Sequence, residues 1–316
     1  MPPKIKTMAV LPATRFLAAM LAVWALACLP TVLAANSAGC GKAPTLTSGE
    51  QKALTINNKS RKWILRLPSN YDKSRPYKLI FGLHWLNADY KGEPPPPCSQ
   101  GTAGSLFSRQ SPAVDGGTAP YYGLRALDKN QTAIFVAPDG LNKGWGNAGG
   151  EDVTFIDEIM KKIEEDLCVN EAFRFTLGFS YGGAMSYSLA CSRPDIFRAV
   201  AVLSGSQLSG CSGGTKPVAY YGQHGVKDSV LNISGGRSLR DKFLANNGCT
   251  KATAQEPASG SRKHIKTTYT GCSEDHPVQW TAFDGDHTAL PNDSGGDGGP
   301  NSWTIAEVWT FFSQFK

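Results

Sequence analysis

The stretch FRFTLGFSYGGAMSYSLACS, residues 173–192, contains the change from strand to helix that decides the fold. Its apolar first part predicts a buried strand over 173–179, and 181–192 predicts a helix that Pro194 ends. Between them lies a G-x-S-x-G pentapeptide centred on Ser180. At a strand-to-helix turn this motif holds the serine hydroxyl above the sheet as a nucleophile. The alternative is a glycine-rich turn with an incidental serine.

Strands and helices alternate on both sides of this stretch. Short apolar or alternating runs predict strands, and apolar residues at helical spacing predict helices. The expected strands are 62–67 (an edge strand), 78–85, 132–138, 199–203, 218–223 and 278–283, and the expected helices are 152–167, 238–246 and 303–315. This order predicts an α/β protein of the α/β-hydrolase type, with a mostly parallel central sheet covered by helices on both faces.

The first 35 residues are typical of a signal peptide. Lys4 and Lys6 are followed by an apolar run over 16–33 and by small residues up to Ala35. A membrane anchor is the alternative, because the run approaches spanning length, and Pro30 favours cleavage. We therefore expect a secreted, extracellular protein whose residues 36–316 form a single catalytic domain.

Composition excludes several classes of partner. The chain of 316 residues carries a net charge of +6, which falls to about +3 without the basic residues of the leader. The sequence contains no basic stripe of the kind that would predict a nucleic-acid partner. No later apolar run is long enough to span a membrane. We expect a monomer.

The cysteines and sequons agree with secretion. The cysteines beyond the leader are scattered without a CxxC pair, which disfavours a metal site and favours disulfides. We predict a bridge between Cys249 and Cys272, and the odd number leaves one thiol free or paired with another chain. The sequons that predict N-glycosylation are Asn58, Asn130, Asn232 and Asn292.

A serine nucleophile requires a histidine base. The histidines that follow Ser180 with a plausible orienting carboxylate between are His264, His276 and His287. His287 comes directly after the expected strand 278–283, where this fold places its base, whereas the other two lie in polar stretches. We therefore predict His287 as the catalytic base.

The carboxylate that orients the base is expected after another strand. Asp228 follows the strand 218–223 by one short turn and fits the chain order serine, aspartate, histidine. The rivals are Asp241 on a helix face, Asp275 late in the chain, and the histidine's near neighbours Asp284 and Asp286. His224 is expected to be structural.

An oxyanion hole needs two backbone N–H groups. One is expected from Tyr181, directly after the serine, and the other from Trp85 or Leu86 in the loop after the strand 78–85. His84 either orients this loop or is a buried, hydrogen-bonded histidine.

Two segments show no periodicity. Residues 91–117 are rich in proline, glycine and serine and predict a long surface loop, and 292–301 predict a flexible turn.

Several runs together resemble the fungal feruloyl esterases, which are related to acetyl xylan esterases and polyhydroxybutyrate depolymerases. They are CGKAP from Cys40, PYYGL from Pro120, PDGLNKGWGN from Pro138, GEDVTFID from Gly150, GFSYGGAMSYSLACSR from Gly178 and GDH from Gly285. The resemblance implies an α/β-hydrolase that releases ferulate from feruloylated arabinoxylan or pectin without a metal or cofactor. It also implies the triad Ser180, Asp228 and His287.

Aromatic residues near the expected sheet edge are candidates for binding the ferulate ring. We predict this role for Trp85, Tyr122 and Trp145, although ordinary packing is the alternative for each. The long loop 91–117 departs from the family pattern and leaves open an acetyl xylan esterase or a polyhydroxybutyrate depolymerase-like esterase. A binding protein of the same fold is a further alternative, which the presence of all triad residues disfavours.

Overall fold

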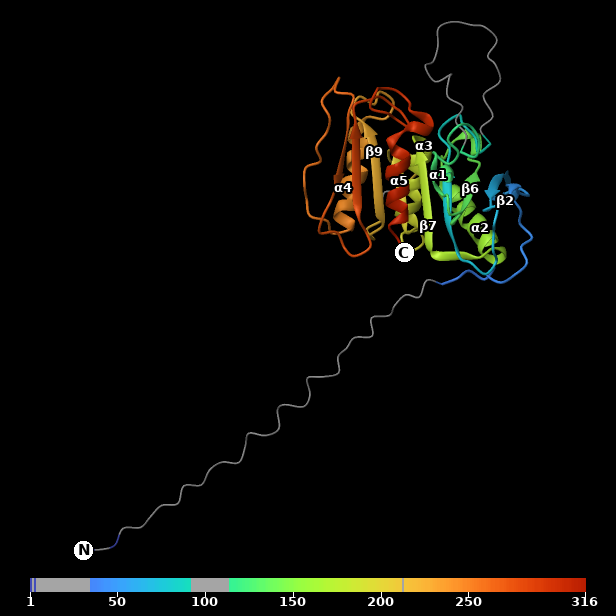
Figure 1. Ribbon diagram of the computed structural model, residues 1–316, viewed down its shortest axis with the longest axis horizontal. Helices are drawn as coiled ribbons and strands as arrows, with labels where there is room; N and C mark the ends of the chain where they lie inside the picture. Colours follow the sequence, from blue (N-terminus) through green and yellow to red (C-terminus); the bar gives the residue numbers. More distant parts are fainter. Residues whose placement is uncertain (2, 4–34, 92–113, 212) are drawn as a thin grey trace. The chain divides into compact units, whose positions relative to one another are not determined.

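A nine-stranded sheet lies at the centre of the computed structural model, which describes residues 1, 3, 35–91, 114–211 and 213–316 (Figure 1). Its strands, in spatial order, are β1 (Gly49–Glu50), β4 (Trp63–Arg66), β6 (Ala133–Pro138), β5 (Tyr77–Leu83), β7 (Val169–Phe179), β8 (Ala199–Leu203), β9 (Ala219–Gly225), β11 (Val278–Phe283) and β10 (His264–Thr268). All neighbours from β6 to β11 are parallel, and the pairs at either end of the sheet are antiparallel. Strands β2 (Leu54–Ile56) and β3 (Lys59–Arg61) form a separate hairpin.

Helices cover both faces of the sheet. Apolar side chains of α2 (Glu151–Asp166), α3 (Tyr181–Ser192) and α4 (Ile233–Asn246) pack in one core, and those of α1 (Leu124–Leu127) and α5 (Trp303–Ser313) pack in the other. Figure 1 shows α5, in red, crossing one face. Strand β8 serves both cores, because successive side chains point to opposite faces: Val200 and Val202 enter the first, and Ala199, Ala201 and Leu203 enter the second. The predicted α/β class is confirmed.

The expected elements differ from the structure in a few places. The bounds of α3, β8 and β11 are those predicted from the sequence. The strand at 62–67 is not the edge strand, because β1 pairs along its outer side. Strand β10 was not expected, since its residues HIKTT read as polar. Helix α4 begins five residues before the predicted 238, where the Asn232 side chain accepts a hydrogen bond from the Ser234 N–H.

The order of the strands reverses beside β5. Strand β6, which follows it in the chain, lies on one side, and β7 lies on the other. In open α/β sheets, ligands bind at the carboxyl ends of the strands where the order reverses. The carboxyl ends of β5 and β7 lead to Trp85 and Ser180, so the fold brings the expected oxyanion loop and nucleophile to this point.

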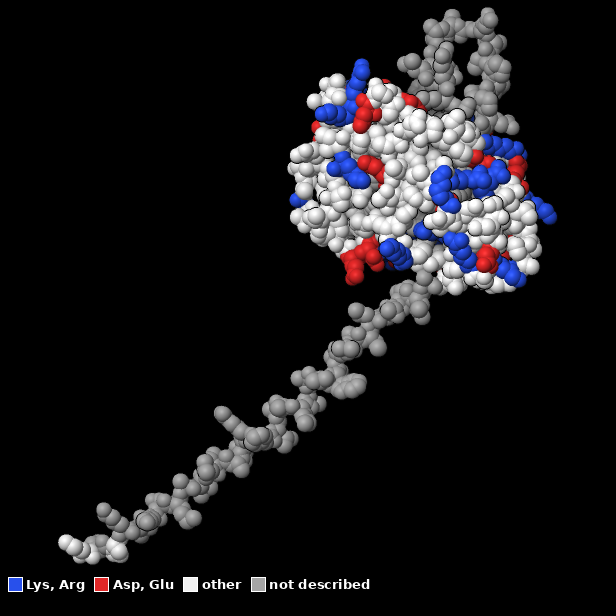
Figure 2. All heavy atoms as spheres, in the orientation of Figure 1, with Lys and Arg blue, Asp and Glu red and all other residues white. Residues whose placement is uncertain are grey.

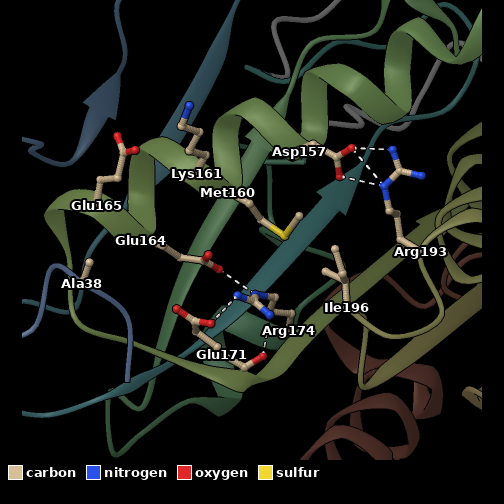
Figure 3. A pocket seen from close by; sticks show the side chains of 10 residues that line it. All are labelled: Ala38, Asp157, Met160, Lys161, Glu164, Glu165, Glu171, Arg174, Arg193 and Ile196. Atoms are coloured by element: carbon tan, nitrogen blue, oxygen red, sulfur yellow. Dashed lines mark hydrogen bonds and ion pairs between the residues drawn. The ribbon is translucent and has the colours of Figure 1, made fainter. Parts of the chain in front are cut away.

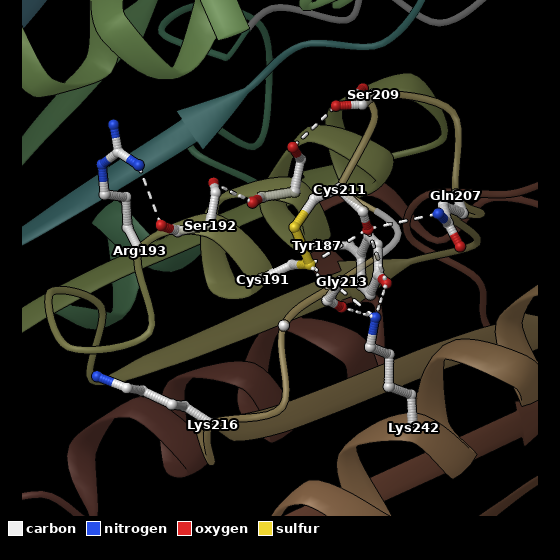
Figure 4. The surroundings of a disulfide bond; sticks show 12 residues. Tyr187, Cys191, Ser192, Arg193, Gln207, Ser209, Cys211, Gly213, Lys216 and Lys242 are labelled. Carbon is white, nitrogen blue, oxygen red and sulfur yellow. Dashed lines mark hydrogen bonds between the residues drawn. A yellow bond between two sulfur atoms is a disulfide. The ribbon is translucent and has the colours of Figure 1, made fainter.

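Three disulfides join described residues: Cys40–Cys168, Cys191–Cys211 and Cys249–Cys272. The last confirms the predicted pair. The Cys191–Cys211 bond ties α3 to the loop that follows β8, and Figure 4 shows Lys242 of α4 reaching the same place, where it donates to the Gly213 carbonyl. Cys98 lies outside the described residues.

Most of the predicted loop 91–117 also lies outside the described residues. Its last part is not simply a surface loop, because Val114 and Asp115 are buried and the Asp115 carboxylate accepts hydrogen bonds from Arg66. On the face drawn in Figure 2, basic and acidic side chains lie in small groups separated by wide uncharged areas. Among the described residues, no helix has both the length and the apolar character to cross a membrane.

Candidate active site

Ser180 lies at a sharp turn between β7 and α3. Its backbone has φ 56° and ψ −116°, a conformation that costs a non-glycine residue free energy and occurs at functional sites. The flanking glycines permit the turn: a Cβ on Gly178 would lie 2.4 Å from the Gly182 carbonyl carbon, and one on Gly182 would lie 2.1 Å from the Leu83 oxygen. The pentapeptide is therefore a strained elbow packed against the end of β5.

Asp228 and His287 meet at the carboxyl ends of β9 and β11. The His287 Nδ1 and the Asp228 Oδ2 are 2.7 Å apart, and both side chains are almost fully buried. The other carboxylate oxygen accepts the backbone N–H groups of Val230 and Leu231. The His287 ring lies 4.5 Å from the ring of Phe179, the residue before Ser180. The structure thus brings the predicted acid and base together beside the elbow.

A second imidazole reaches the same carboxylate. The Nε2 of buried His224 lies 2.7 Å from the Leu231 carbonyl oxygen and 3.2 Å from the Asp228 Oδ2. Burial alone would raise the pKa of Asp228, but the hydrogen bonds from His224 and His287 outweigh it and hold that pKa below its ordinary range. Asp228 therefore stays ionised and can stabilise a protonated His287.

The rival residues have other partners. The His264 Nδ1 lies 2.8 Å from the Asp293 carboxylate, and the His276 Nδ1 lies 3.4 Å from the Ser273 hydroxyl. Asp284 pairs with Lys227, and Asp286 accepts from the N–H and hydroxyl of Ser229; Asp241 pairs with Arg240. Of the three candidate bases His264, His276 and His287, only His287 contacts Asp228.

The candidate oxyanion donors lie at two backbone segments that touch. Tyr181 is the first residue of α3, so its N–H has no partner within the helix. The backbone at Gly182 packs closely against the carbonyl groups of Leu83 and His84, the two residues that precede Trp85. Within the described residues, no acceptor takes the backbone N–H of Trp85 or Leu86. Both remain candidates for the second donor.

Comparison with known proteins decides the family. A protein of Neurospora crassa named feruloyl esterase D is 46% identical over 293 residues, covering 92% of this chain and 95% of its own length. Feruloyl esterase C of Emericella nidulans is also 46% identical, covering 90% of this chain and 97% of its own length. The chain belongs to the feruloyl esterase family.

Solved structures of distant esterases share the fold. An acetyl xylan esterase from Aspergillus awamori matches 84% of this feruloyl esterase chain and 98% of its own, with a TM-score of 0.55 at 14% identity. A ferulic acid esterase from Anaeromyces mucronatus matches 87% and 93% of the two chains, with a TM-score of 0.50 at 17% identity. No family model matches the chain. The fold is that of the α/β-hydrolases.

His84 holds the loop that carries the candidate oxyanion donors of this feruloyl esterase. Its ring is fully buried, with Nδ1 2.8 Å from the Trp85 carbonyl oxygen, while Nε2 accepts the Gly140 N–H at 2.9 Å. These bonds fit a neutral ring with its proton on Nδ1. Burial lowers the pKa of His84 from 6.5 to about 4. Both interpretations made from the sequence apply, since the ring is buried and also orients the loop.

His84 should make folding pH-dependent. Because its pKa is lower in the folded state, its contribution to stability is complete above pH 6.5 and is lost as pH falls toward 4. Relative to a His84→Gln variant, we expect the free energy of unfolding of the unmodified protein to fall by about 1.4 kcal/mol per pH unit in this window, about 3 kcal/mol in total. Urea unfolding at pH 7, 6, 5 and 4 measures this, and equal pH dependence of the two proteins would contradict it.

Two of the three aromatic residues predicted to bind substrate are buried and bond to the backbone. Trp145 is fully buried and its indole N–H donates to the His84 carbonyl, so it supports the oxyanion loop and has no surface for a ligand. Tyr122 is 5% exposed, and its hydroxyl bonds to the backbones of Leu83 and Phe179. Only Trp85 of the three is partly exposed, with its ring edge-on to Phe179 at 5.7 Å.

Exposed apolar side chains lie at the carboxyl edge of the sheet, where Ser180 also lies. Apart from Met1, the large apolar residues that are exposed among those described are Leu86, Leu208 and Val230. They lie on the loops after β5, β8 and β9, at carboxyl ends of parallel strands. A Cβ on Gly144 would lie 3.0 Å from the Tyr181 ring and 3.4 Å from Leu86, so these two side chains both pack next to the backbone of Gly144.

A pocket lies away from Ser180, Asp228 and His287. It measures about 400 Å³ and is lined mainly by charged residues of α2, the start of β7 and the segment after α3 (Figure 3). Both of its arginines are paired with carboxylates that also line it, Arg193 with Asp157 and Arg174 with Glu164 and Glu171. None of Ser180, Asp228 and His287 lines it, so this pocket is not part of the candidate active site. The described residues contain no cluster of histidine, cysteine and carboxylate side chains suited to a metal ion.

Proposed function

We propose that this protein is a secreted serine esterase that hydrolyses feruloyl and related hydroxycinnamoyl esters of arabinoxylan or pectin. The observation that carries the proposal is the strained Ser180 elbow with an Asp228–His287 pair beside it, in a chain of the feruloyl esterase family. The loops around that edge carry exposed apolar side chains, which suit an aromatic acyl group.

The proposed reaction is acyl transfer in two steps. His287 takes the hydroxyl proton of Ser180 as the serine oxygen bonds to the ester carbonyl carbon, and Asp228 stabilises the imidazolium. The tetrahedral oxyanion is held by the N–H of Tyr181 and that of Trp85 or Leu86. The bond to the sugar oxygen then breaks as His287 donates its proton to that oxygen. Water then attacks the acyl-enzyme carbonyl while His287 takes its proton, and His287 returns a proton to the Ser180 oxygen as ferulate is released. The proposed reaction uses no metal or cofactor.

The acyl group is proposed to lie against Trp85, Leu86 and Tyr181. Trp85 and Tyr181 are partly exposed and Leu86 is 51% exposed, and these residues directly flank the candidate oxyanion donors. A flat methoxyphenol ring gains stacking and apolar contact on such a surface.

Secretion and glycosylation belong to the same proposal. Asn36 pairs with Asn170, and the Ser37 hydroxyl donates to the Leu167 carbonyl, so the first residues after the expected leader already belong to the catalytic domain. Disulfides suit an oxidising compartment. Asn58, Asn130 and Asn232 are exposed, whereas Asn292 is partly buried. We expect sugar on the exposed sequons of a monomeric, extracellular protein.

Substrate assays test the proposed activity. We expect kcat/KM to be at least about 10-fold higher for methyl ferulate than for methyl acetate, because only the larger acyl group contacts the apolar surface. Ferulate should also be released from feruloylated arabinoxylan. Hydrolysis of 4-nitrophenyl acetate and acetylated xylan without release of ferulate would instead support an acetyl xylan esterase and overturn the proposed substrate.

A further inference from the structure

The hydroxyl of Tyr122 joins the two strands that lead into the active site. It donates to the Leu83 carbonyl oxygen at 2.6 Å and accepts the Phe179 N–H at 3.1 Å. Leu83 is the last residue of β5 and Phe179 the last of β7. The two strands pair through Leu83 and Gly178, so the hydroxyl lies at the final rung of their ladder.

Each of these backbone groups is close in sequence to one half of the proposed catalytic machinery. Leu83 lies two residues before Trp85, a candidate oxyanion donor, and Phe179 lies directly before Ser180. One oxygen atom therefore links the segment that places the nucleophile to the segment that places the oxyanion donor. The relative position of these two groups determines how well a tetrahedral intermediate is held.

The surroundings of Tyr122 hold its hydroxyl in place. The side chain is almost fully buried, and its ring lies 6.4 Å from the ring of Trp85. Burial raises the pKa of the phenol, so the proton that binds Leu83 is retained. Tyr121 and Tyr122 both have φ 54°, a left-handed conformation that is unfavourable for residues other than glycine. The fold keeps this unfavourable backbone conformation, which points the Tyr122 hydroxyl at the paired ends of β5 and β7.

We propose that Tyr122 is a positioning residue for ester hydrolysis, and that its hydroxyl sets the separation of the oxyanion loop from Ser180. The inference rests on the proposed serine mechanism and replaces the substrate-binding role predicted from the sequence. Tyr122 does not touch the reacting atoms. It acts through the backbones of Leu83 and Phe179.

Tyr121 offers a matched control. It is adjacent in the chain, has the same φ and is fully buried, and its hydroxyl also makes a hydrogen bond, to the Asp115 carboxylate at 3.1 Å. That contact belongs to the Asp115–Arg66 pair and not to the strand ends. Tyr121→Phe and Tyr122→Phe therefore remove the same atom from equally buried sites, and only the second releases Leu83 and Phe179.

The test compares both variants for kcat, KM and melting temperature, and for inhibition by phenylboronic acid, whose boron becomes tetrahedral on the serine oxygen. For Tyr122→Phe we expect kcat to fall between about 10- and 100-fold with KM within about two-fold, and the inhibition constant to rise by a similar factor. For Tyr121→Phe we expect a comparable loss of melting temperature with kcat nearly unchanged. Equal losses of kcat in the two variants, or an unchanged inhibition constant in Tyr122→Phe, would overturn the proposal.

A second variant covers a failure of Tyr122→Phe to fold. Replacing Tyr122 with 4-aminophenylalanine keeps a polar group able to donate to Leu83, and we expect a folded enzyme with kcat reduced by between about 3- and 10-fold, because an aromatic amine accepts the Phe179 N–H poorly. Full kcat in this variant would overturn the requirement for the hydroxyl. All measurements are repeated with 4-nitrophenyl acetate. If the unmodified protein releases no ferulate, the substrate proposal fails, while the acetate series still measures the role of Tyr122.

Discussion

Replacing Ser180 with alanine lowers kcat/KM for methyl ferulate by at least about 10⁴-fold, because no other group can form the acyl-enzyme. Stability should change little, since alanine occupies the same strained turn and the Ser180 N–H still donates to the Leu203 carbonyl. The measurement is hydrolysis of methyl ferulate together with labelling by a fluorophosphonate, which should modify the unmodified protein once and the variant not at all.

Ser186→Ala is the matched control for this substitution. Ser186 is a buried serine of the same helix, α3, and its hydroxyl lies 3.2 Å from the Thr176 hydroxyl, away from the elbow. We expect full labelling and nearly full activity. Activity of Ser180→Ala comparable to that of Ser186→Ala would remove Ser180 from the mechanism.

Replacing Asp228 with asparagine should lower kcat by about 10⁴-fold with little change in KM. The amide oxygen can still accept the N–H groups of Val230 and Leu231, so the turn is kept. The amide nitrogen then faces the His287 Nδ1 and donates to it. This fixes the ring proton on the far nitrogen, which can no longer take the proton of Ser180. Steady-state kinetics and a melting curve measure both effects.

Asp241→Asn provides the comparison. Asp241 also lies after Ser180 in the chain, but its carboxylate is largely exposed and pairs with Arg240. An exposed ion pair contributes little to stability, so we expect kcat and melting temperature close to those of the unmodified protein. If Asp228→Asn retained kcat within 10-fold, another carboxylate would have to orient His287.

The central strands and the contact between Asp228 and His287 could be predicted from the sequence because local patterns encode them. A fully buried strand such as β8 is an unbroken apolar run, and the carboxyl ends of parallel strands meet at one edge whatever the loops between them do. The rule on strand ends therefore predicts that Asp228 and His287 lie close together, and their side chains are in contact.

Other features depended on tertiary packing. Strand β10 is an edge strand with partly exposed side chains, so it lacks an apolar pattern. Helix α4 contains Gly235 and Gly236, which disfavour helix, yet a Cβ on Gly236 would lie 2.3 Å from the His224 Nδ1. Here close packing determines the residue type more than helix propensity does.

The aromatic residues show the limit most clearly. Trp85, Tyr122 and Trp145 are all in loops near the carboxyl edge, and the sequence pattern does not distinguish a ring that faces solvent from one that supports the backbone. The distinguishing fact is where each polar atom bonds, the Trp145 indole to His84 and the Tyr122 hydroxyl to the strand ends.

The exposed apolar side chains of Leu86, Leu208 and Val230 each lie on a different loop. Substitutions at exposed positions outside tight packing usually change stability by less than about 0.5 kcal/mol. A mutant library that varies these three side chains one at a time can therefore explore new acyl groups while Ser180, Asp228 and His287 are kept. The proposed catalytic centre and the proposed acyl-binding surface are then separable at the level of single side chains, although they share loops.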